Sequence, residues 1–416
     1  MKTIVAHPGQ QHSYHVAAAV KSAGCLDCYI TAIYDKEKSP WMKMIKLFSN
    51  SSDKAKAIKR KCTHLEDKEV IQYYQLLSLF SIFLTRYLKG CNIGYWLDRK
   101  ISDQFGIKVA KYAIKKKVDA VICFSTNERM CFKYLEKHAP KIIRLVDCAN
   151  SPINYMKHIY NQDIALSCKN GLKKEVPSFW NNKILKNQTE SISLTNLFLA
   201  PSQFVKQGLK YNGVSEERIR IIPYGSNFAV SLSPQKPISR VHFIYVGQIT
   251  YRKGVHHLLK VFSELPQADI KLIGSIPYNS KLYKKYIKFH NIFFVGHVSN
   301  DRIIDYLTKA NVFVFPSLSE GFSLACLEAL SQGLPIICTE NSGINDVIIN
   351  GKNGYVIKAS DEDMLKKKVQ HFLQHPEIIP DMSQCAIQTA KEFTWDNYRD
   401  KLGNYLLFCK RIQWGR

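Results

Sequence analysis

The fold of the second half of the chain is decided by the stretch Asn311-Val-Phe-Val-Phe-Pro-Ser-Leu-Ser-Glu-Gly-Phe-Ser-Leu-Ala-Cys-Leu-Glu-Ala-Leu-Ser-Gln-Gly-Leu-Pro335. Its apolar run Val312–Phe315 has the character of a central parallel strand that is buried on both faces, and Pro316 ends the run because proline cannot continue a strand ladder. Ser323 then stands where a helix N-cap is needed, and Gly333 marks the helix end. The stretch therefore predicts a strand–loop–helix unit of an α/β domain.

Similar units recur along the whole chain, because short β-branched or aromatic runs alternate with helical stretches. The expected strands are Thr3–Ala6, Cys28–Ala32, Ala120–Phe124, Ile142–Val146, Leu197–Ala200 and Arg218–Ile222, followed by His242–Val246, Ile270–Ile273, Ile292–Val295, Val312–Phe315 and Ile336–Cys338. The expected helices are His12–Ala23, Ile101–Lys116, Glu128–His138, Gln203–Tyr211, Val255–Leu265, Asp301–Ala310, Ser323–Ser331 and Asp361–Leu373. The fold class is therefore α/β, and 416 residues are enough for two cores.

The domain boundary is predicted where the periodicity stops. Serines and prolines between Ser226 and Arg240 favour an interdomain linker. We therefore expect a first Rossmann-like domain over residues 1–225, a linker over 226–240, a second Rossmann-like domain over 241–395, and a final helix over 396–416 that packs back on the first domain. Ligands of open parallel sheets bind beyond the carboxyl ends of the strands, so we expect the two domains to face each other across a cleft.

Two glutamates surround the expected helix start. Glu320 lies beyond the carboxyl end of the strand, and Gly321 lets the backbone pass close to a ligand. The free amides at the positive end of the helix that follows Ser323 suit a diphosphate. A nucleoside along this helix would place its ribose near Glu328, eight residues after Glu320. Either glutamate alone reads equally well as a solvated residue, but the combination favours a nucleotide-sugar site.

A second stretch, Phe243–Val255, has the same strand–turn–helix character and carries Gly247, Arg252 and Lys253 in its turn. Two cations there can neutralise a diphosphate, since each charge-assisted hydrogen bond contributes about 1.5–3 kcal/mol. A purely structural role is disfavoured because cations are unfavourable at the start of a helix. This turn is therefore the expected partner of the glutamate-bearing loop.

The first domain offers fewer candidates. The loop Pro8–His12 follows the first expected strand, and Asp147 follows the strand Ile142–Val146. His12 and Asp147 are candidates for contacting the reacting sugar or the acceptor, although each could equally be a helix or turn cap.

Together these stretches resemble the GT-B class of glycosyltransferases, and specifically the retaining family 4 type, whose hallmark Glu-Gly-Phe-x-Leu-x-x-x-Glu stands at residues 320–328. The resemblance implies that Glu320 contacts the donor sugar and is a catalytic residue, and that Glu328 binds the ribose. It also implies that backbone amides around Phe322, Ser323 and Leu324 hold the diphosphate.

The resemblance extends to both sides of the expected cleft. It implies that Gly9 belongs to the loop that approaches the diphosphate from the first domain. Family members often carry arginine where Gln248 stands, which leaves open whether Arg252 replaces that cation. The stretches Ala200–Phe204, Ile222–Gly225 and Asn350–Val356 also match, mainly in architecture.

The activity implied by the resemblance is transfer of a sugar from a nucleotide-sugar donor to a saccharide acceptor with retention of anomeric configuration. The leaving diphosphate helps to deprotonate the acceptor, and positive groups stabilise it, so no cofactor and no metal are expected. One alternative is a GT-B relative that epimerises or hydrolyses a nucleotide sugar. Another is a non-catalytic basic scaffold that binds membranes. No nucleic-acid partner is expected, because no recognisable binding motif accompanies the positive charge.

The charge and the cysteines bear on location. The formal net charge is +25, with a dense basic cluster at Lys36, Lys38, Lys43, Lys46, Lys54, Lys56, Lys59, Arg60 and Lys61. The aromatic-rich segment Val70–Leu88 follows it and reads either as a helix in an anionic bilayer interface or as a buried core helix. Twelve cysteines without regular spacing favour free thiols in a reducing setting. The expected location is cytoplasmic, on the inner face of the cytoplasmic membrane, and the expected acceptor is a lipid-linked saccharide of bacterial O-antigen, capsule or lipopolysaccharide synthesis.

Overall fold

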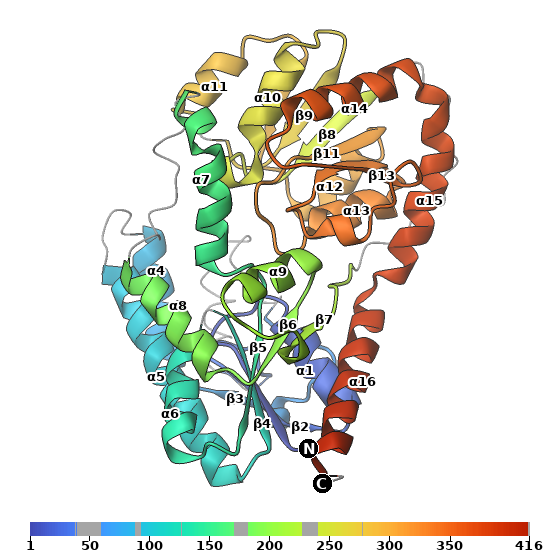
Figure 1. Cartoon of the computed structure of the whole chain (residues 1–416). Coiled ribbons are helices and arrows are strands. Elements are labelled where there is room, and N and C mark those ends of the chain that lie inside the picture. The colour runs from blue at the N-terminus through green and yellow to red at the C-terminus, as the bar shows by residue number, and fades with distance from the viewer. Residues whose placement is uncertain are drawn as a thin grey trace.

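Two parallel sheets, one after the other along the chain, organise the molecule (Figure 1). The structure is a computed structural model that describes residues 1–37, 39, 60–87, 93–125, 127–169, 182–226, 240–276 and 278–414. Six lysines of the basic cluster, Lys38, Lys43, Lys46, Lys54, Lys56 and Lys59, lie outside the described residues, as does most of the expected linker 226–240.

The N-terminal sheet has seven parallel strands in the order β3-β2-β1-β4-β5-β6-β7. The strands are β1 (Thr3–Ala6), β2 (Leu26–Thr31), β3 (Val70–Gln72), β4 (Ala120–Phe124), β5 (Ile143–Asp147), β6 (Leu197–Ala200) and β7 (Ile219–Ile221). The helices are α1 (Ser13–Ser22), α4 (Gln75–Tyr87), α5 (Ile93–Lys116), α6 (Arg129–His138), α7 (Ile153–Lys169), α8 (Asn182–Leu194) and α9 (Gln203–Tyr211). Strands β1 and β4 are buried along their whole length, which explains why their sequences are apolar without alternation.

The C-terminal sheet has six parallel strands in the order β10-β9-β8-β11-β12-β13. The strands are β8 (His242–Val246), β9 (Asp269–Ile273), β10 (Ile292–Gly296), β11 (Val312–Phe315), β12 (Ile336–Thr339) and β13 (Gly354–Ile357). The helices are α10 (Val255–Ser263), α11 (Lys281–Tyr286), α12 (Asn300–Leu307), α13 (Leu324–Ser331) and α14 (Glu362–Gln374), with the 3-10 turns η4 (Tyr251–Lys253) and η5 (Ile344–Asp346). Strands β8 and β11 are neighbours, so the turn after β8 and the loop after β11 leave the sheet at the same edge.

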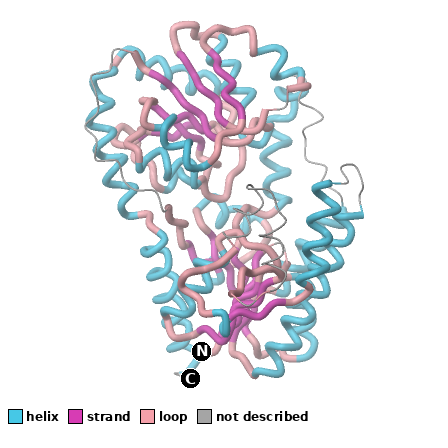
Figure 2. Tube along the Cα trace, turned by 180° about the vertical axis from the view of Figure 1, so that it is seen from behind, coloured by secondary structure: helices cyan, strands magenta, loops and turns pink. Residues whose placement is uncertain are grey.

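The last two helices, α15 (Ile379–Glu392) and α16 (Trp395–Trp414), carry the chain back from the second domain to the first (Figures 1 and 2). Helix α15 packs on α13, and α16 packs on α1. The ring of Trp395 lies flat on His15, with centroids 3.8 Å apart and planes within 1°. The two chain ends consequently lie close together, beside the N-terminal sheet.

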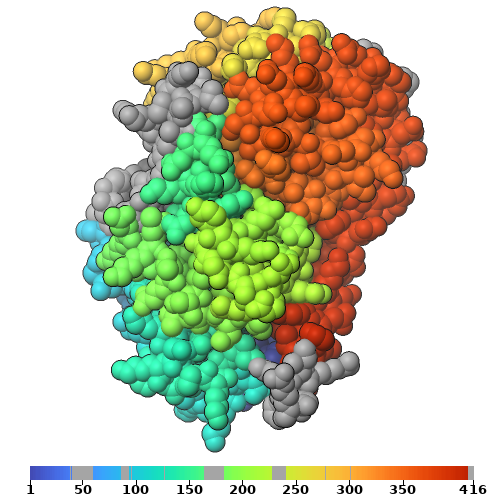
Figure 3. Space-filling model, in the orientation of Figure 1, coloured from blue at the N-terminus to red at the C-terminus, as the bar shows by residue number. Residues whose placement is uncertain are grey.

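The two domains touch through the segment that begins α9 (Figure 3). The Ser202 hydroxyl donates a hydrogen bond of 2.7 Å to the Gly321 carbonyl, and the Gln203 amide donates one of 2.6 Å to Asp346. A side chain at position 321 would collide with the carbonyl oxygen of Ala149. The absence of a side chain at Gly321 therefore permits close approach of the two backbones.

The prediction that Val70–Leu88 forms a single helix is wrong. Val70–Gln72 is instead the edge strand β3, which pairs with β2. The chain then breaks at Tyr74, whose φ of 60° is left-handed, and α4 starts at Gln75. Ten cysteines whose side chains the structure describes are free thiols, and eight of them are buried, in line with the expectation from their spacing.

Candidate active site

Glu320 is the centre of a compact charged group at the carboxyl edge of the C-terminal sheet. Its carboxylate accepts hydrogen bonds from Arg252 Nη1, at 2.5 Å, and from Lys253 Nζ. Burial alone would raise the pKa of Glu320, but the two cations lower it below its ordinary value. The group carries one net positive charge, which leaves it suited to an anionic ligand.

The turn that carries the two cations is locked against the loop that carries the glutamate. Gly254 has a φ of 65°, and a side chain there would collide with the Pro316 carbonyl oxygen. The Leu318 amide donates to the Arg252 carbonyl at 3.0 Å, and Arg252 Nη1 also donates to the Ser319 carbonyl at 3.0 Å. The turn after β8 and the loop after β11 are thus in direct contact, as predicted.

Helix α13 begins beside this charged group. The Ser323 hydroxyl accepts a hydrogen bond from the Cys326 amide, which confirms the expected N-cap. Phe322 is buried, Leu324 is 38% exposed, and Gly247 lies in the loop after β8. Gln248, which stands at the position where the family often has arginine, is exposed, and its carbonyl accepts from the Tyr245 hydroxyl at 2.8 Å.

Glu328 lies on the second turn of α13 and is half-buried. Its carboxylate accepts no hydrogen bond and forms no ion pair with any residue that the structure describes, in contrast to Glu320. Burial raises the pKa of Glu328 to about 7. A half-buried carboxylate without protein partners can accept hydrogen bonds from a ligand, and ligand hydroxyls would meet that need.

On the N-terminal side, His12 and Asp147 form a hydrogen-bonded pair. His12 Nε2 lies 2.9 Å from Asp147 Oδ1, which also accepts from the Tyr224 hydroxyl at 3.1 Å. The Tyr398 hydroxyl, on α16, donates to the other carboxylate oxygen at 3.3 Å. Asp147 is only 1% exposed, and its hydrogen bond to His12 fixes the orientation of the His12 ring. Because a carboxylate oxygen only accepts, His12 carries a proton on Nε2.

Gly9 lies in the loop before α1, as expected. Its amide donates a hydrogen bond of 2.8 Å to His7 Nδ1. Burial lowers the pKa of His7 to about 4, so this ring is the neutral acceptor that the hydrogen bond requires. The loop is therefore tied to the end of β1.

Tyr224 joins the two groups of candidate residues. Its ring lies 4.4 Å from the ring of His12 and 5.9 Å from that of Phe322, measured between centroids. Tyr224 was not among the predicted site residues, because the match of Ile222–Gly225 to the family is mainly architectural. No local signal marks Tyr224, because the residues that it contacts, such as Asp147 at a separation of 77 positions, lie far from it in the sequence.

Metal-ligating side chains do not gather at the charged group within the described part of the chain. An Asp-x-Asp stretch, Asp361–Asp363, opens α14, where Asp361 caps the helix and Glu362 pairs with Lys260 and His257. One group of a carboxylate and two histidines, Asp163, His256 and His257, lies between the domains.

Residues 233–392 match the family model described as "Glycosyl transferases group 1". Over 174 residues the chain is 30% identical to Sulfoquinovosyl transferase SQD2 of Arabidopsis thaliana, covering 41% of this chain and 33% of that protein. Over 223 residues it is 26% identical to the Capsular polysaccharide biosynthesis glycosyltransferase CapM of Staphylococcus aureus, covering 51% of this chain and 54% of that protein. The chain thus spans about a third to half the length of these curated relatives.

The likeness to solved structures extends over the whole chain. HepE of Anabaena, solved in complex with UDP, superposes with a TM-score of 0.61 at 12% identity, over 98% of this chain and 99% of that one. At such identity the likeness concerns the fold. The protein therefore has the GT-B fold, and residues 233–392 match the glycosyl transferases group 1 family. The resemblance found in the sequence is confirmed.

Proposed function

We propose that the protein is a retaining glycosyltransferase that moves a sugar from a nucleoside diphosphate donor to a saccharide. The observation that carries this proposal is the junction of Arg252, Lys253 and Glu320 at the capped start of α13. One helix turn further lies Glu328, whose carboxylate pairs with no residue in the described part of the chain. The two cations and the helix start suit a diphosphate, Glu328 suits the ribose hydroxyls, and Glu320 suits the donor sugar.

The proposed reaction needs little acid–base chemistry from the protein. The bond between the anomeric carbon and the diphosphate oxygen breaks, the acceptor oxygen bonds to the same carbon on the same face, and the acceptor proton passes to the diphosphate. Arg252 and Lys253 stabilise the charge that develops on the leaving group. His12, held by Asp147, contacts the reacting sugar or the acceptor.

The proposed acceptor is a lipid-linked saccharide of bacterial surface polysaccharide synthesis. The relative CapM supports the proposed role in surface polysaccharide synthesis. A surface of α4 and α5 supports the proposal that the acceptor is linked to a lipid. Six large apolar side chains on these helices are between 47% and 60% exposed: Leu76, Leu77, Phe80, Phe83, Ile93 and Trp96. We call this set the α4–α5 apolar patch. This patch is proposed to dock on an anionic membrane surface. Within the described residues, no helix is both long and apolar enough to cross a bilayer.

The test is a transfer assay with nucleotide sugars carrying UDP, GDP, ADP and dTDP, with and without lipid-linked saccharide acceptors. We expect nucleoside diphosphate release that depends on the acceptor, and a product whose anomeric configuration by NMR equals that of the donor. Glu320→Gln should abolish release. Free sugar or an epimer formed without an acceptor would instead establish the hydrolase or epimerase alternative, and no reaction with any donor would favour the non-catalytic scaffold.

A further inference from the structure

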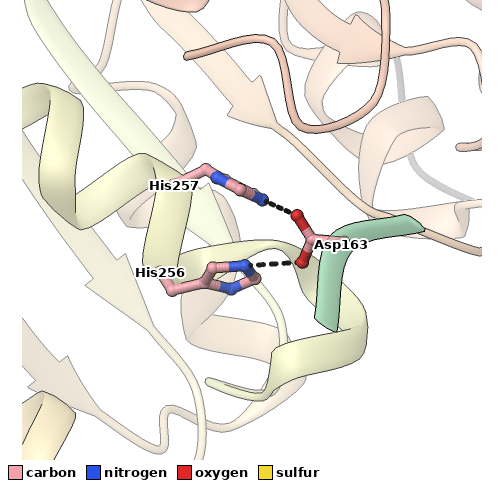
Figure 4. A group of neighbouring side chains, drawn as sticks. All are labelled: Asp163, His256 and His257. Atoms are coloured by element: carbon pink, nitrogen blue, oxygen red, sulfur yellow. Dashed lines mark hydrogen bonds and ion pairs between the residues drawn. The ribbon is translucent and has the colours of Figure 1, made fainter. Parts of the chain in front are cut away.

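Helix α7 of the N-terminal domain ends on α10 of the C-terminal domain, and a carboxylate stands at the contact. Asp163, on α7, lies with one oxygen 3.1 Å from His256 Nε2 and with the other 2.9 Å from His257 Nε2 (Figure 4). All three side chains are at most 2% exposed. His257 Nδ1 lies 2.8 Å from Glu362 of α14. The contact is therefore a buried polar chain that crosses the domain boundary.

The hydrogen bonds fix where the protons are. Carboxylate oxygens only accept, so both Nε2 atoms carry protons, and His257 must also carry one on Nδ1 to donate to Glu362. His257 is then an imidazolium between two carboxylates. Burial alone would lower the pKa of His257, but its bonds to Asp163 and Glu362 raise it above its ordinary value. Burial lowers the pKa of His256, which remains neutral.

Charge balance supports this assignment. The groups that face His257 are Asp163 from α7, Glu362 from α14, and His256 and Lys260 from its own helix, with Lys260 paired to Glu362. Two positive charges, on His257 and Lys260, then match the two carboxylates. A buried group of charges is tolerated only when it is paired in this way. The four charges therefore cancel, while Nδ1 of His256 is buried without a hydrogen-bond partner among the described residues.

The same contact reaches the donor site. His256 follows Lys253 by three residues, and its ring stacks on Tyr251, with centroids 5.0 Å apart. Tyr251 opens the turn η4, which carries Arg252 and Lys253, and its hydroxyl donates at 3.3 Å to the Tyr160 carbonyl on α7. Helix α7 is thus attached at two points to the segment that presents the diphosphate-binding cations.

We infer that Asp163 is a positioning residue of the donor site: through His256 and the His257 imidazolium it holds the η4–α10 segment, and with it Arg252 and Lys253, against the N-terminal domain. The inference rests on the proposed function, in that the two cations bind the donor diphosphate. Donor binding would then depend on Asp163, a residue of the N-terminal domain. It would also depend on the second proton of His257, which makes this side chain an imidazolium.

The positioning role is tested by titrating UDP, GDP, ADP and dTDP into the wild type, Asp163→Asn and the control Asp381→Asn, an exposed site on α15. We expect Asp163→Asn to raise the Kd of the nucleotide that binds the wild type by about fivefold or more, as couplings between linked elements do, and the control to leave it unchanged. If the wild type binds none, the proposed function fails. Normal wild-type binding with an unchanged Kd in Asp163→Asn overturns only the positioning role.

Should Asp163→Asn not fold, Tyr251→Phe replaces it, because this variant removes the second attachment of α7 and leaves the buried charges intact. It too should raise the Kd of the nucleotide, while the melting temperature falls only slightly. An unchanged Kd in a folded Tyr251→Phe protein would contradict the positioning of η4 by α7.

The proton is tested without any nucleotide, by measuring the melting temperatures of the wild type and His257→Gln from below pH 6.5 upward. A raised pKa in the folded state means that the stabilisation is fully present below the ordinary histidine pKa of about 6.5 and is lost as the pH rises through the raised value. We therefore expect the difference in melting temperature between the wild type and His257→Gln to become smaller as the pH rises. A difference that is independent of pH, or a stoichiometric zinc ion that stabilises the purified wild type, would overturn the imidazolium.

Discussion

Glu320 and Glu328 lie eight residues apart in one motif but have opposite environments. Glu320 is held in its ionised form by Lys253 and Arg252, whereas no described residue donates to the carboxylate of Glu328, and burial raises its pKa to about 7. The first is already arranged as part of the charged group. The carboxylate of Glu328 would receive hydrogen bonds only when a ligand donates them.

A pH dependence of donor binding follows from Glu328. Ribose hydroxyls donate to the ionised carboxylate, so binding must remove its proton when the pH is below the pKa. With a pKa of about 7, the ionised fraction and hence the affinity for a nucleotide sugar should rise about tenfold between pH 6 and pH 8. Calorimetric titration at both pH values measures this rise.

The matched variant Glu328→Gln has no proton to lose. It should bind more weakly than the wild type at pH 8, and its affinity should be nearly flat across this range. An equally steep rise in Glu328→Gln would show that another group titrates, and would remove Glu328 from the ribose role.

At the scale of elements, the turn η4–α10 and the loop between β11 and α13 behave as one unit because they touch through backbone. Gly254 is the residue that permits the contact, since its φ is 65° and the Pro316 carbonyl occupies the place of a side chain. Gly24 has a φ of 63° but open space around it. Both positions share the cost of a left-handed backbone, but only a side chain at position 254 would also collide with a neighbour. A comparison of alanine substitutions at Gly24 and Gly254 therefore separates the two costs.

We expect Gly254→Ala to lower the free energy of unfolding by more than Gly24→Ala, for which the left-handed conformation alone costs roughly 1 kcal/mol. Gly254→Ala should also weaken nucleotide binding, because it shifts Arg252 and Lys253 away from Glu320. Denaturant unfolding and nucleotide titration of both variants measure the two effects. Equal losses of stability with unchanged nucleotide affinity would contradict the coupling of the two loops.

The elements that could be predicted are those with complete local signals. Strand β11 and helix α13 have an apolar run, a terminating proline and a serine cap within one stretch, and Val312–Phe315 is found as predicted. The three-residue strand β3 had no such signal, since Val70–Gln72 runs directly into apolar residues that form a helix. Helices α7, α8, α11 and α15 were not predicted; α11 has only 6 residues, too few for a helical period to show.

The same limit applies to the site. The pair of Glu320 with Arg252 and Lys253 was within reach because both stretches carry recognisable turn chemistry. The pairing of Asp163 with His256 joins residues 93 positions apart, and neither belongs to a local motif. Contacts of that kind are set by how the domains meet, which no short window of sequence contains.

At the scale of the whole molecule, the net charge of +25 and the α4–α5 apolar patch favour association with an anionic membrane. We expect the protein to cosediment with vesicles of phosphatidylcholine and phosphatidylglycerol, and less with phosphatidylcholine alone. Phe80→Ser/Phe83→Ser should weaken this binding about a hundredfold or more, because burial of each phenylalanine contributes roughly 1.5 kcal/mol or more.

The control is Phe408→Ser, which removes an equally exposed phenylalanine from α16, far along the chain from the patch. This variant should bind vesicles as the wild type does. Equal binding by Phe80→Ser/Phe83→Ser would leave charge as the sole attraction and contradict the role of the patch.

Arg252 and Lys253 are proposed to bind the diphosphate of a nucleotide. The most direct measurement is thermal unfolding of the wild type with UDP, GDP, ADP and dTDP, beside Arg252→Gln/Lys253→Gln and the exposed control pair Arg302→Gln/Lys309→Gln. A nucleotide at a hundred times its Kd should stabilise the wild type and the control by about 2.7 kcal/mol and leave the site variant unchanged. Stabilisation of none of the proteins by any nucleotide, or equal stabilisation of all three, would contradict it.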